Sequence, residues 1–193
     1  MQRVAAIALV AVAVAVGAAP AAGCCRGIHL QAKHPPAHPA PLVIGDSVVM
    51  AAAGRLARAG FDVNAREGRF MRHGLAILRR RRRHDTRPRV VVIALGTNAP
   101  ATLRQIRRAV ILLGPGRRLA LVTPFRSYRA IGSGTIYAAK RRWPRRVQVL
   151  DWAASASGRA SWFWGDGTHL RPAGARAYAH VVERALPKNR RRR

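Results

Sequence analysis

The chain of 193 residues is long enough to bury a core within a single globular domain. Its 36 Lys and Arg stand against 7 Asp and Glu, and the formal net charge of +29 attracts polyanions but specifies no fold. The two cysteines, Cys24 and Cys25, are adjacent, so neither a disulfide that staples the fold nor a zinc site follows from them. The sequence therefore calls for no metal and no cofactor.

The N-terminal segment reads as a signal for export. One cation, an apolar run over residues 4–19 and an Ala-rich stretch predict a signal peptide over residues 1–23 and secretion to the cell envelope. A retained membrane anchor is the alternative, although a full span needs roughly 20 apolar residues. The letters AAGC, ending at Cys24, resemble a lipobox that would anchor the chain through that cysteine, but they lack the usual Leu.

Residues 24–40 are predicted to form a linker. They are rich in Pro and His and show no apolar periodicity, and Pro biases a chain to extended forms. A metal site at His29, His34 and His38 is the alternative, but no fixed scaffold is expected to present these side chains. The last residues, 188–193, form a basic tail.

Residues 41–187 alternate between short apolar runs and segments with helical spacing. Five runs predict buried strands, at 41–46, 61–66, 89–96, 117–124 and 146–153. Segments between and after them predict helices, at 47–60, 70–80, 101–114, 136–143 and 172–186. Such alternation predicts an α/β fold, a three-layer α/β/α sandwich around a parallel sheet of about five strands.

Polar motifs follow these strands at the edge where parallel sheets form their sites. Ser47 follows the first strand, Asn98 follows the third, and Asp166 and His169 precede the last helix. The set fits acyl transfer, in which a serine nucleophile needs an adjacent base and the base needs an orienting carboxylate. Asn98 would offer its amide to a developing oxyanion.

The motifs GDSV, EGR, GTN and DGTHL resemble, in order, four blocks of the SGNH (GDSL-like) hydrolase superfamily. The resemblance spans residues 41–186 and implies a flavodoxin-like sandwich and an acyl-serine intermediate. It implies a catalytic triad of Ser47, Asp166 and His169, and an oxyanion hole made by the Ser47 and Gly68 N–H groups and the Asn98 side chain.

The blocks are most similar to SGNH domains attached to membrane acyltransferases that O-acetylate bacterial cell-wall polymers. Two departures stand out: Ala99 follows Asn98 where many members carry Asp, and the membrane-spanning acyltransferase half is absent. We therefore expect a secreted serine esterase that hydrolyses or transfers an acyl ester, most simply acetyl, on envelope carbohydrate such as acetylated polysaccharide. The alternative is a non-catalytic, polyanion-binding envelope protein on the same scaffold.

Each site residue also has a structural interpretation. Ser47 could cap its helix, Asn98 could cap the next one, and Gly68 could serve a positive φ angle. Asp46 is expected to make turn hydrogen bonds, and His73, His84 and His180 to lie at the surface or in packing. Residues 162–164 could line a pocket or clamp their loop, and residues 123–125 could form a second pocket wall.

The Arg runs leave two interpretations open. Residues 79–84, RRRRRH, and the basic tail could hold the protein on an anionic envelope polymer or a membrane surface, or they could be solvated. We expect no specific nucleic acid partner, because the chain carries an export signal and no base-stacking aromatic pattern. We expect a monomer.

Overall fold

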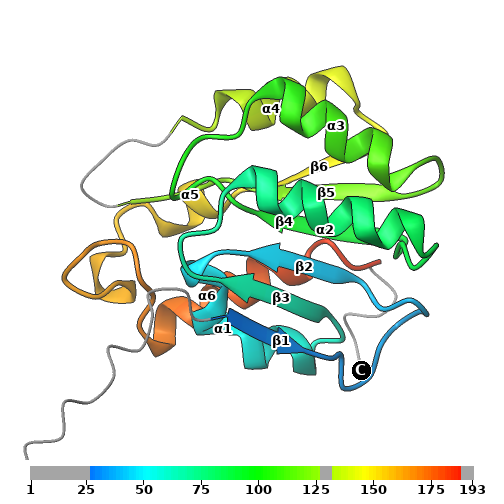
Figure 1. The fold of residues 1–193 in the computed structure, drawn as a ribbon. Coiled ribbons are helices and arrows are strands. Elements are labelled where there is room, and N and C mark those ends of the chain that lie inside the picture. The colour runs from blue at the N-terminus through cyan, green and yellow to red at the C-terminus, as the bar shows by residue number, and fades with distance from the viewer. Residues whose placement is uncertain (1–26, 127–131, 188–193) are drawn as a thin grey trace, which may run out of the picture.

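The computed structural model describes residues 27–126 and 132–187, which form a mixed six-stranded sheet between two layers of helices (Figure 1). The spatial order is β1-β3-β2-β4-β5-β6, and every neighbouring pair is parallel except β1 and β3. The strands are β1 (Gly27–Leu30), β2 (Leu42–Gly45), β3 (Asp62–Arg66), β4 (Val90–Ala94), β5 (Arg118–Val122) and β6 (Val147–Leu150). The predicted signal peptide, Cys24 and the basic tail lie outside the described residues.

Helices cover both faces of the sheet, as a three-layer sandwich requires (Figure 1). One face carries α1 (Ser47–Arg58), α5 (Trp152–Ala156), the 3-10 turn η1 (Ala160–Trp162) and α6 (Pro172–Glu183). The other carries α2 (Met71–Arg83), α3 (Leu103–Leu113) and α4 (Gly134–Arg142). Within the two described stretches, no helix combines the length and the apolar character that crossing a membrane demands.

Successive side chains of each strand point to opposite faces of the sheet, so the core has two parts, one on each face. In β2, Val43 packs with the α1–α6 side, while Leu42 and Ile44 pack with α2 and α3. In β4, Val92 and Ile93 divide in the same way. Both faces of these central strands are buried, which explains their continuous apolar runs. Each fully buried Val, Leu or Ile contributes about 1.5–3 kcal/mol relative to exposure, so the central strands anchor both layers.

The N-terminal edge strand corrects the linker prediction. Residues 27–30 pair antiparallel with β3, and the following turn is tied down by the Ala32 N–H, which donates to Asp62 Oδ1 at 3.1 Å. The Lys33 N–H then donates to the Ala57 carbonyl of α1 at 3.0 Å. Without β1, β3 would present an open row of backbone donors and acceptors. The strand escaped prediction because it is short, half-exposed and followed by prolines.

The strand order places a switch point between β2 and β4. From β2 the chain runs outward to β3, then returns past β2 to β4 and continues to β5 and β6 on the other side. In open α/β sheets a crevice forms outside the carboxyl ends of the strands where the order reverses. The segments that follow β2 and β4 contain Ser47 and Asn98, so both lie at this point.

The turn from β2 into α1 leaves no room for a side chain at Gly45. A Cβ atom added there would lie 2.1 Å from Cγ2 of Val49, a residue buried in the first turn of α1. We predict that Gly45→Ala lowers the free energy of unfolding by about 1–3 kcal/mol, because an overpacked buried site must displace its neighbours. Urea denaturation measures the loss.

Gly54→Ala is the matched control, since Gly54 lies in the same helix and its added Cβ would meet only the Arg58 guanidinium, at 3.7 Å. Because Ala has a higher helix propensity than Gly, we expect the free energy of unfolding of this variant to rise by about 0.5–1 kcal/mol. Equal stability changes in the two variants would contradict the steric argument for Gly45.

Candidate active site

Ser47 is the first residue of α1, and its hydroxyl is not used to cap the helix. The N-cap is Asp46, whose Oδ1 accepts a hydrogen bond from the Val48 N–H at 3.0 Å. The interpretation of Ser47 as the cap is therefore wrong, and the turn hydrogen bond expected of Asp46 is present. Because Asp46 satisfies the helix start, the Ser47 hydroxyl remains available to a partner across the site.

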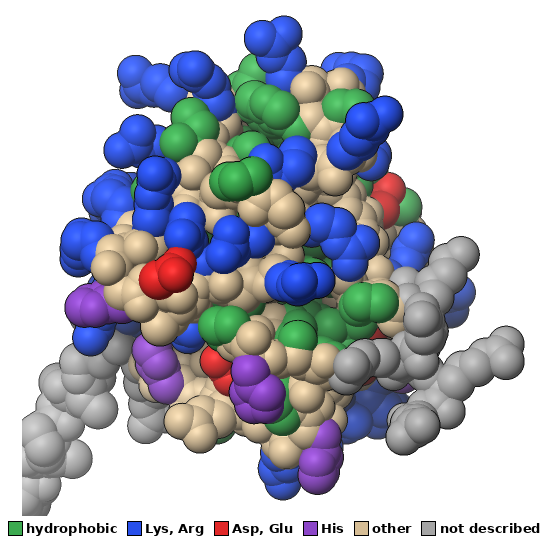
Figure 2. All heavy atoms as spheres, turned by 90° about the vertical axis from the view of Figure 1, so that its right-hand side faces the viewer, with side chains coloured by type: hydrophobic (Ala, Val, Ile, Leu, Met, Phe, Trp, Pro, Cys, Tyr) green, Lys and Arg blue, Asp and Glu red, His purple; other side chains and the backbone are tan. Residues whose placement is uncertain are grey.

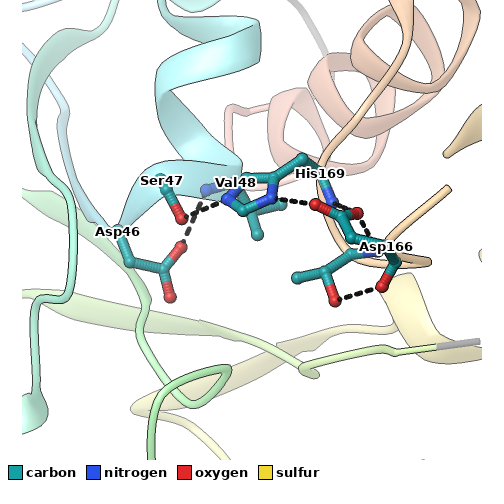
Figure 3. A network of polar contacts seen from close by, with 6 residues as sticks. Asp46, Ser47, Val48, Asp166 and His169 are labelled. Carbon is teal, nitrogen blue, oxygen red and sulfur yellow. Dashed lines mark hydrogen bonds and ion pairs between the residues drawn. The ribbon is translucent and has the colours of Figure 1, made fainter. Parts of the chain in front are cut away.

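That partner is His169, which joins Ser47 to Asp166 in one relay (Figure 3). His169 Nε2 lies 3.0 Å from Ser47 Oγ, and His169 Nδ1 lies 2.5 Å from Asp166 Oδ2. Ser47 and His169 are 122 positions apart in the sequence, so packing of α1 against the loop before α6 creates the contact. The His169 and Asp166 side chains are about half exposed, which leaves the relay open to solvent.

A compact loop holds the imidazole in place. Asp166 Oδ1 accepts hydrogen bonds from the backbone N–H groups of Thr168 and His169, each at 2.9 Å. Gly167 takes a φ of 62°, in the left-handed region that favours glycine. The loop is closed by an antiparallel bridge between Phe163 and Leu170. The carboxylate thus orients its own loop with one oxygen and the imidazole with the other.

These hydrogen bonds keep Asp166 ionised. Burial by itself would raise the pKa of the carboxyl, but hydrogen bonds from the His169 ring and from the Thr168 and His169 N–H groups outweigh it and lower the pKa to about 2. An ionised Asp166 fixes the tautomer with the proton on His169 Nδ1 and leaves Nε2 as the acceptor that faces Ser47.

Asn98 contacts the turn that contains Gly68 and Arg69. Asn98 Nδ2 donates a hydrogen bond to the carbonyl of Arg69, next to Gly68, at 3.3 Å. Gly68 has a φ of 62°, so the positive φ angle considered for this glycine is present. Asn98 does not cap the next helix, because the N-cap of α3 is Thr102, whose Oγ1 accepts from the Gln105 N–H at 3.2 Å. The structure thus brings blocks two and three into contact.

A pocket opens beside the turn between β2 and α1. Its lining includes Val48 from α1, Gly96 and Thr97 after β4, and the segment 123–125 after β5. The second pocket wall expected at residues 123–125 is therefore present. Trp152 and Tyr178 close the pocket from the α5–α6 side.

Of the aromatic residues 162–164, the first two take the clamping role, and none of the three belongs to the lining of the pocket. Trp162 stacks on Trp152 with ring centroids 5.8 Å apart, and Phe163 is buried against Phe125 and Trp152. These two rings clamp the loop that carries His169. Trp164 is exposed, and the Arg171 guanidinium lies over its ring, 4.8 Å from the centroid. The backbone N–H of Trp164 donates to the His169 carbonyl at 2.9 Å.

The remaining histidines have structural surroundings. His73 Nδ1 accepts from the Phe70 N–H at 3.2 Å and so caps the start of α2. His84 is the C-cap of α2. His180 Nδ1 lies 3.4 Å from Glu183 Oε2. Across residues 27–126 and 132–187, no three His, Cys, Asp or Glu side chains gather closely enough to hold a metal ion.

Two buried polar residues at this edge, Arg69 and Tyr178, were not singled out from the sequence, and Thr123 was considered there only as part of a pocket wall. Arg69 is buried, and its Nη1 donates to the Asn64 carbonyl at 2.5 Å. Thr123 is buried after β5, where its hydroxyl donates to Asp151 Oδ1 at 3.0 Å and accepts from the Ala153 N–H at 2.8 Å. Tyr178 is buried in α6, and burial followed by the nearby charge of Asp46 raises its pKa. Only their positions after strands or on the inward face of α6 could have indicated them.

Asp46 is the most unusual ionisable group of the site. Its side chain is buried, and its Oδ2 has no hydrogen-bond partner among the described residues. Burial raises its pKa to about 6, against the lowering effect of the Val48 N–H. Because the folded state holds this proton more tightly than the unfolded chain, the stability contributed by Asp46 is present below pH 3.8 and is lost as the pH rises through about 6.

We predict that Asp46→Asn flattens the dependence of stability on pH over this window. Asn keeps an oxygen that can accept from the Val48 N–H, and it removes the buried charge. The free energy of unfolding of the variant should therefore exceed that of the parent by on the order of 2–3 kcal/mol at neutral pH. Urea denaturation at about pH 4 and about pH 7.5 measures the difference. A variant that is weakened equally at both pH values would show that Asp46 acts only as a cap.

Known proteins resemble this chain in sequence and in fold. No protein-family model matches the sequence. The chain is 28% identical over 156 residues to the peptidoglycan O-acetyltransferase OatA of Listeria monocytogenes, a match that covers 76% of this chain and 24% of OatA. The chain therefore spans about a quarter of the length of that curated relative.

Two solved structures extend the likeness to the fold. The C-terminal catalytic domain of Streptococcus pneumoniae OatA, solved with a methylsulfonyl adduct, superposes with a TM-score of 0.66 at 23% identity, over 82% of this chain and 93% of that one. A putative SGNH hydrolase from Slackia heliotrinireducens superposes with a TM-score of 0.58 at 20% identity. The match covers 76% of this chain and 98% of that one. The predicted fold is therefore confirmed, and the chain shares the fold of the OatA catalytic domain and of this putative SGNH hydrolase.

Proposed function

We propose that the protein is a serine esterase or O-acyltransferase that works through an acyl-serine intermediate. The observation that carries the proposal is the relay of Ser47, His169 and Asp166, with contacts of 3.0 and 2.5 Å. A serine hydroxyl is a weak nucleophile unless a base accepts its proton, and an imidazole is an effective base when a carboxylate orients it. No observation on the described residues favours the non-catalytic alternative.

In the first step Ser47 Oγ attacks the carbonyl carbon of the ester. The Ser47 proton passes to His169 Nε2, the carbonyl π electrons move to its oxygen, and Asp166 stabilises the imidazolium that forms. Collapse of the tetrahedral intermediate breaks the bond to the alcohol oxygen, which takes the proton from His169. The acyl group then remains on Ser47.

The oxyanion of that intermediate would be held by the Ser47 and Gly68 N–H groups and the Asn98 amide. The Ser47 N–H lies at the start of α1, where helix N–H groups and the helix dipole favour negative charge. The hydrogen bond from Asn98 to the Arg69 carbonyl supports this set, because it holds the amide beside the Gly68 turn. Donors fixed before reaction spend little reorganisation energy when the charge develops.

The second step transfers the acyl group to an acceptor hydroxyl. His169 removes a proton from water or from a sugar hydroxyl, which attacks the acyl-serine carbonyl, and Ser47 recovers its proton as it leaves. The half-exposed His169 and Asp166 side chains support access for either acceptor. We propose an acetyl ester of an envelope polysaccharide as substrate. The OatA relative acts on peptidoglycan by name, and the export signal predicted at residues 1–23 agrees with an envelope location.

We predict that Ser47→Ala lowers kcat/KM for p-nitrophenyl acetate by at least about 10³-fold, because the attacking oxygen is lost. A serine-directed sulfonyl fluoride should label the parent once, and mass spectrometry should place the label on Ser47. Acetate release from O-acetylated peptidoglycan, with or without an oligosaccharide acceptor, separates hydrolysis from transfer.

Ser161→Ala is the matched control, since Ser161 is an exposed residue of η1, just before the loop that carries His169. It should keep parental activity and labelling. Ester hydrolysis that persists at the parental rate in Ser47→Ala would refute the proposed mechanism.

We predict that Asn98→Ala lowers kcat by about 10²–10³-fold and changes KM little, because an oxyanion donor acts on the transition state more than on the bound ester. Steady-state kinetics with p-nitrophenyl acetate measures both constants. Labelling of Ser47 by a small sulfonyl fluoride should slow as well. A rise in KM at unchanged kcat would instead assign Asn98 to substrate binding.

A further inference from the structure

The outer layer formed by α2, α3 and α4 is strongly cationic. Helix α2 carries six Arg, α3 carries three Arg, and α4 carries one Lys and two Arg, and none of these helices contains Asp or Glu. The three helices lie side by side on one face of the sheet. Seen from the end where α2 and α3 finish, Lys and Arg crowd the upper half of the molecule, where this layer lies (Figures 1 and 2).

The cations occupy the outward stripe of each helix. In α3, the exposed residues Arg104, Arg107, Arg108 and Ile111 are spaced i, i+3, i+4 and i+7, while Ile106 and its neighbours point into the core. The equivalent exposed positions are Arg72, Arg79, Arg80 and Arg83 in α2 and Tyr137, Lys140 and Arg141 in α4. We call these eleven positions, with Leu103, the cationic face.

The opposite face differs. Its two long helices carry fewer cations, Arg55 and Arg58 in α1 and Arg176 in α6, and α6 also contains Glu183. Ion pairs do not neutralise the cationic face, because the one described ion pair from its three helices joins Arg81, outside the face, to Asp62 at 3.7 Å. A coding bias toward Arg would raise the number of Arg residues on both faces. The excess on one face therefore indicates a function of that surface.

The cationic face also exposes apolar side chains. Leu103 is 41% exposed and Ile111 is 43% exposed, and with Tyr137 they make up three of the four large hydrophobic residues exposed in the described part of the chain. A hydrated anionic polymer offers phosphate groups to Arg but offers nothing to Leu or Ile. An anionic bilayer surface accommodates both, because cations meet lipid headgroups while apolar side chains enter the interface.

We propose that the cationic face docks the protein onto an anionic phospholipid surface. The face runs parallel to the sheet (Figure 1). Ser47 directly follows the carboxyl end of β2, and His169 contacts it there. Docking by this face therefore leaves the relay uncovered at the side and free to meet a substrate above the membrane. The proposal concerns binding alone and does not depend on the chemistry of the relay.

The test compares co-sedimentation of the full chain with vesicles of phosphatidylcholine alone and of equal phosphatidylcholine and phosphatidylglycerol. In Arg104→Gln/Arg108→Gln, the gain in binding caused by phosphatidylglycerol should fall roughly 10–30-fold, since each cation near an anionic surface is worth about a factor of five. The matched control Arg58→Gln/Arg176→Gln removes the same charge from exposed positions of α1 and α6 and should change binding by less than about 2-fold. Residues 4–19 are the same in every variant, so their own contribution cancels.

A third variant, Leu103→Ser/Ile111→Ser, tests the choice of a lipid surface. It should lose about 3–10-fold of the vesicle binding while its binding to soluble polyphosphate stays at the parental level. Equal losses in the two Arg variants would overturn the proposal in favour of diffuse net charge. Vesicle binding that is unaffected by the Leu103 and Ile111 changes would overturn it in favour of a soluble polyanion.

Discussion

The close approach of strand β2 to helix α1 at Gly45 is the constraint on which the site depends. The absence of a Cβ atom at Gly45 lets the helix begin two residues after the strand ends, with Val49 packed against the turn. Asp46 supplies the cap, so the Ser47 hydroxyl projects from the edge of the sheet with its oxygen free for His169 (Figure 3). One tight turn thus fixes both the start of the helix and the direction of the proposed nucleophile.

The loop that carries His169 depends on two different kinds of interaction. Within the loop, Asp166 binds two backbone N–H groups and the imidazole, which makes the segment a small rigid unit. That unit is held against the domain by aromatic packing, since Trp162 and Phe163 rest on Trp152. Local hydrogen bonds set the shape of the loop, and apolar burial sets its place.

The Ser47–His169–Asp166 contacts and the cationic face occupy separate parts of the fold. The relay lies at the strand ends, where irregular segments can present polar groups without disturbing the core. The cationic face is built on the outward stripes of helices whose inward residues, such as Ile106, hold the sheet. The outward charged residues therefore lie apart from the buried residues that position the site.

The five parallel strands, the five longer helices, and the order of Ser47, Asn98 and His169 along the chain could be predicted from the sequence, whereas α5 was missed because Trp152 was placed in the last strand. Short segments of sequence are enough to predict these features, because each segment shows either a continuous apolar run or helical spacing of apolar residues. Tertiary structure alone decided the 3.0 Å contact between residues 122 positions apart and the burial that raises the pKa of Asp46. It also decided the pairing of β1. Distances and desolvation depend on how distant segments pack, and no short window of sequence contains that information.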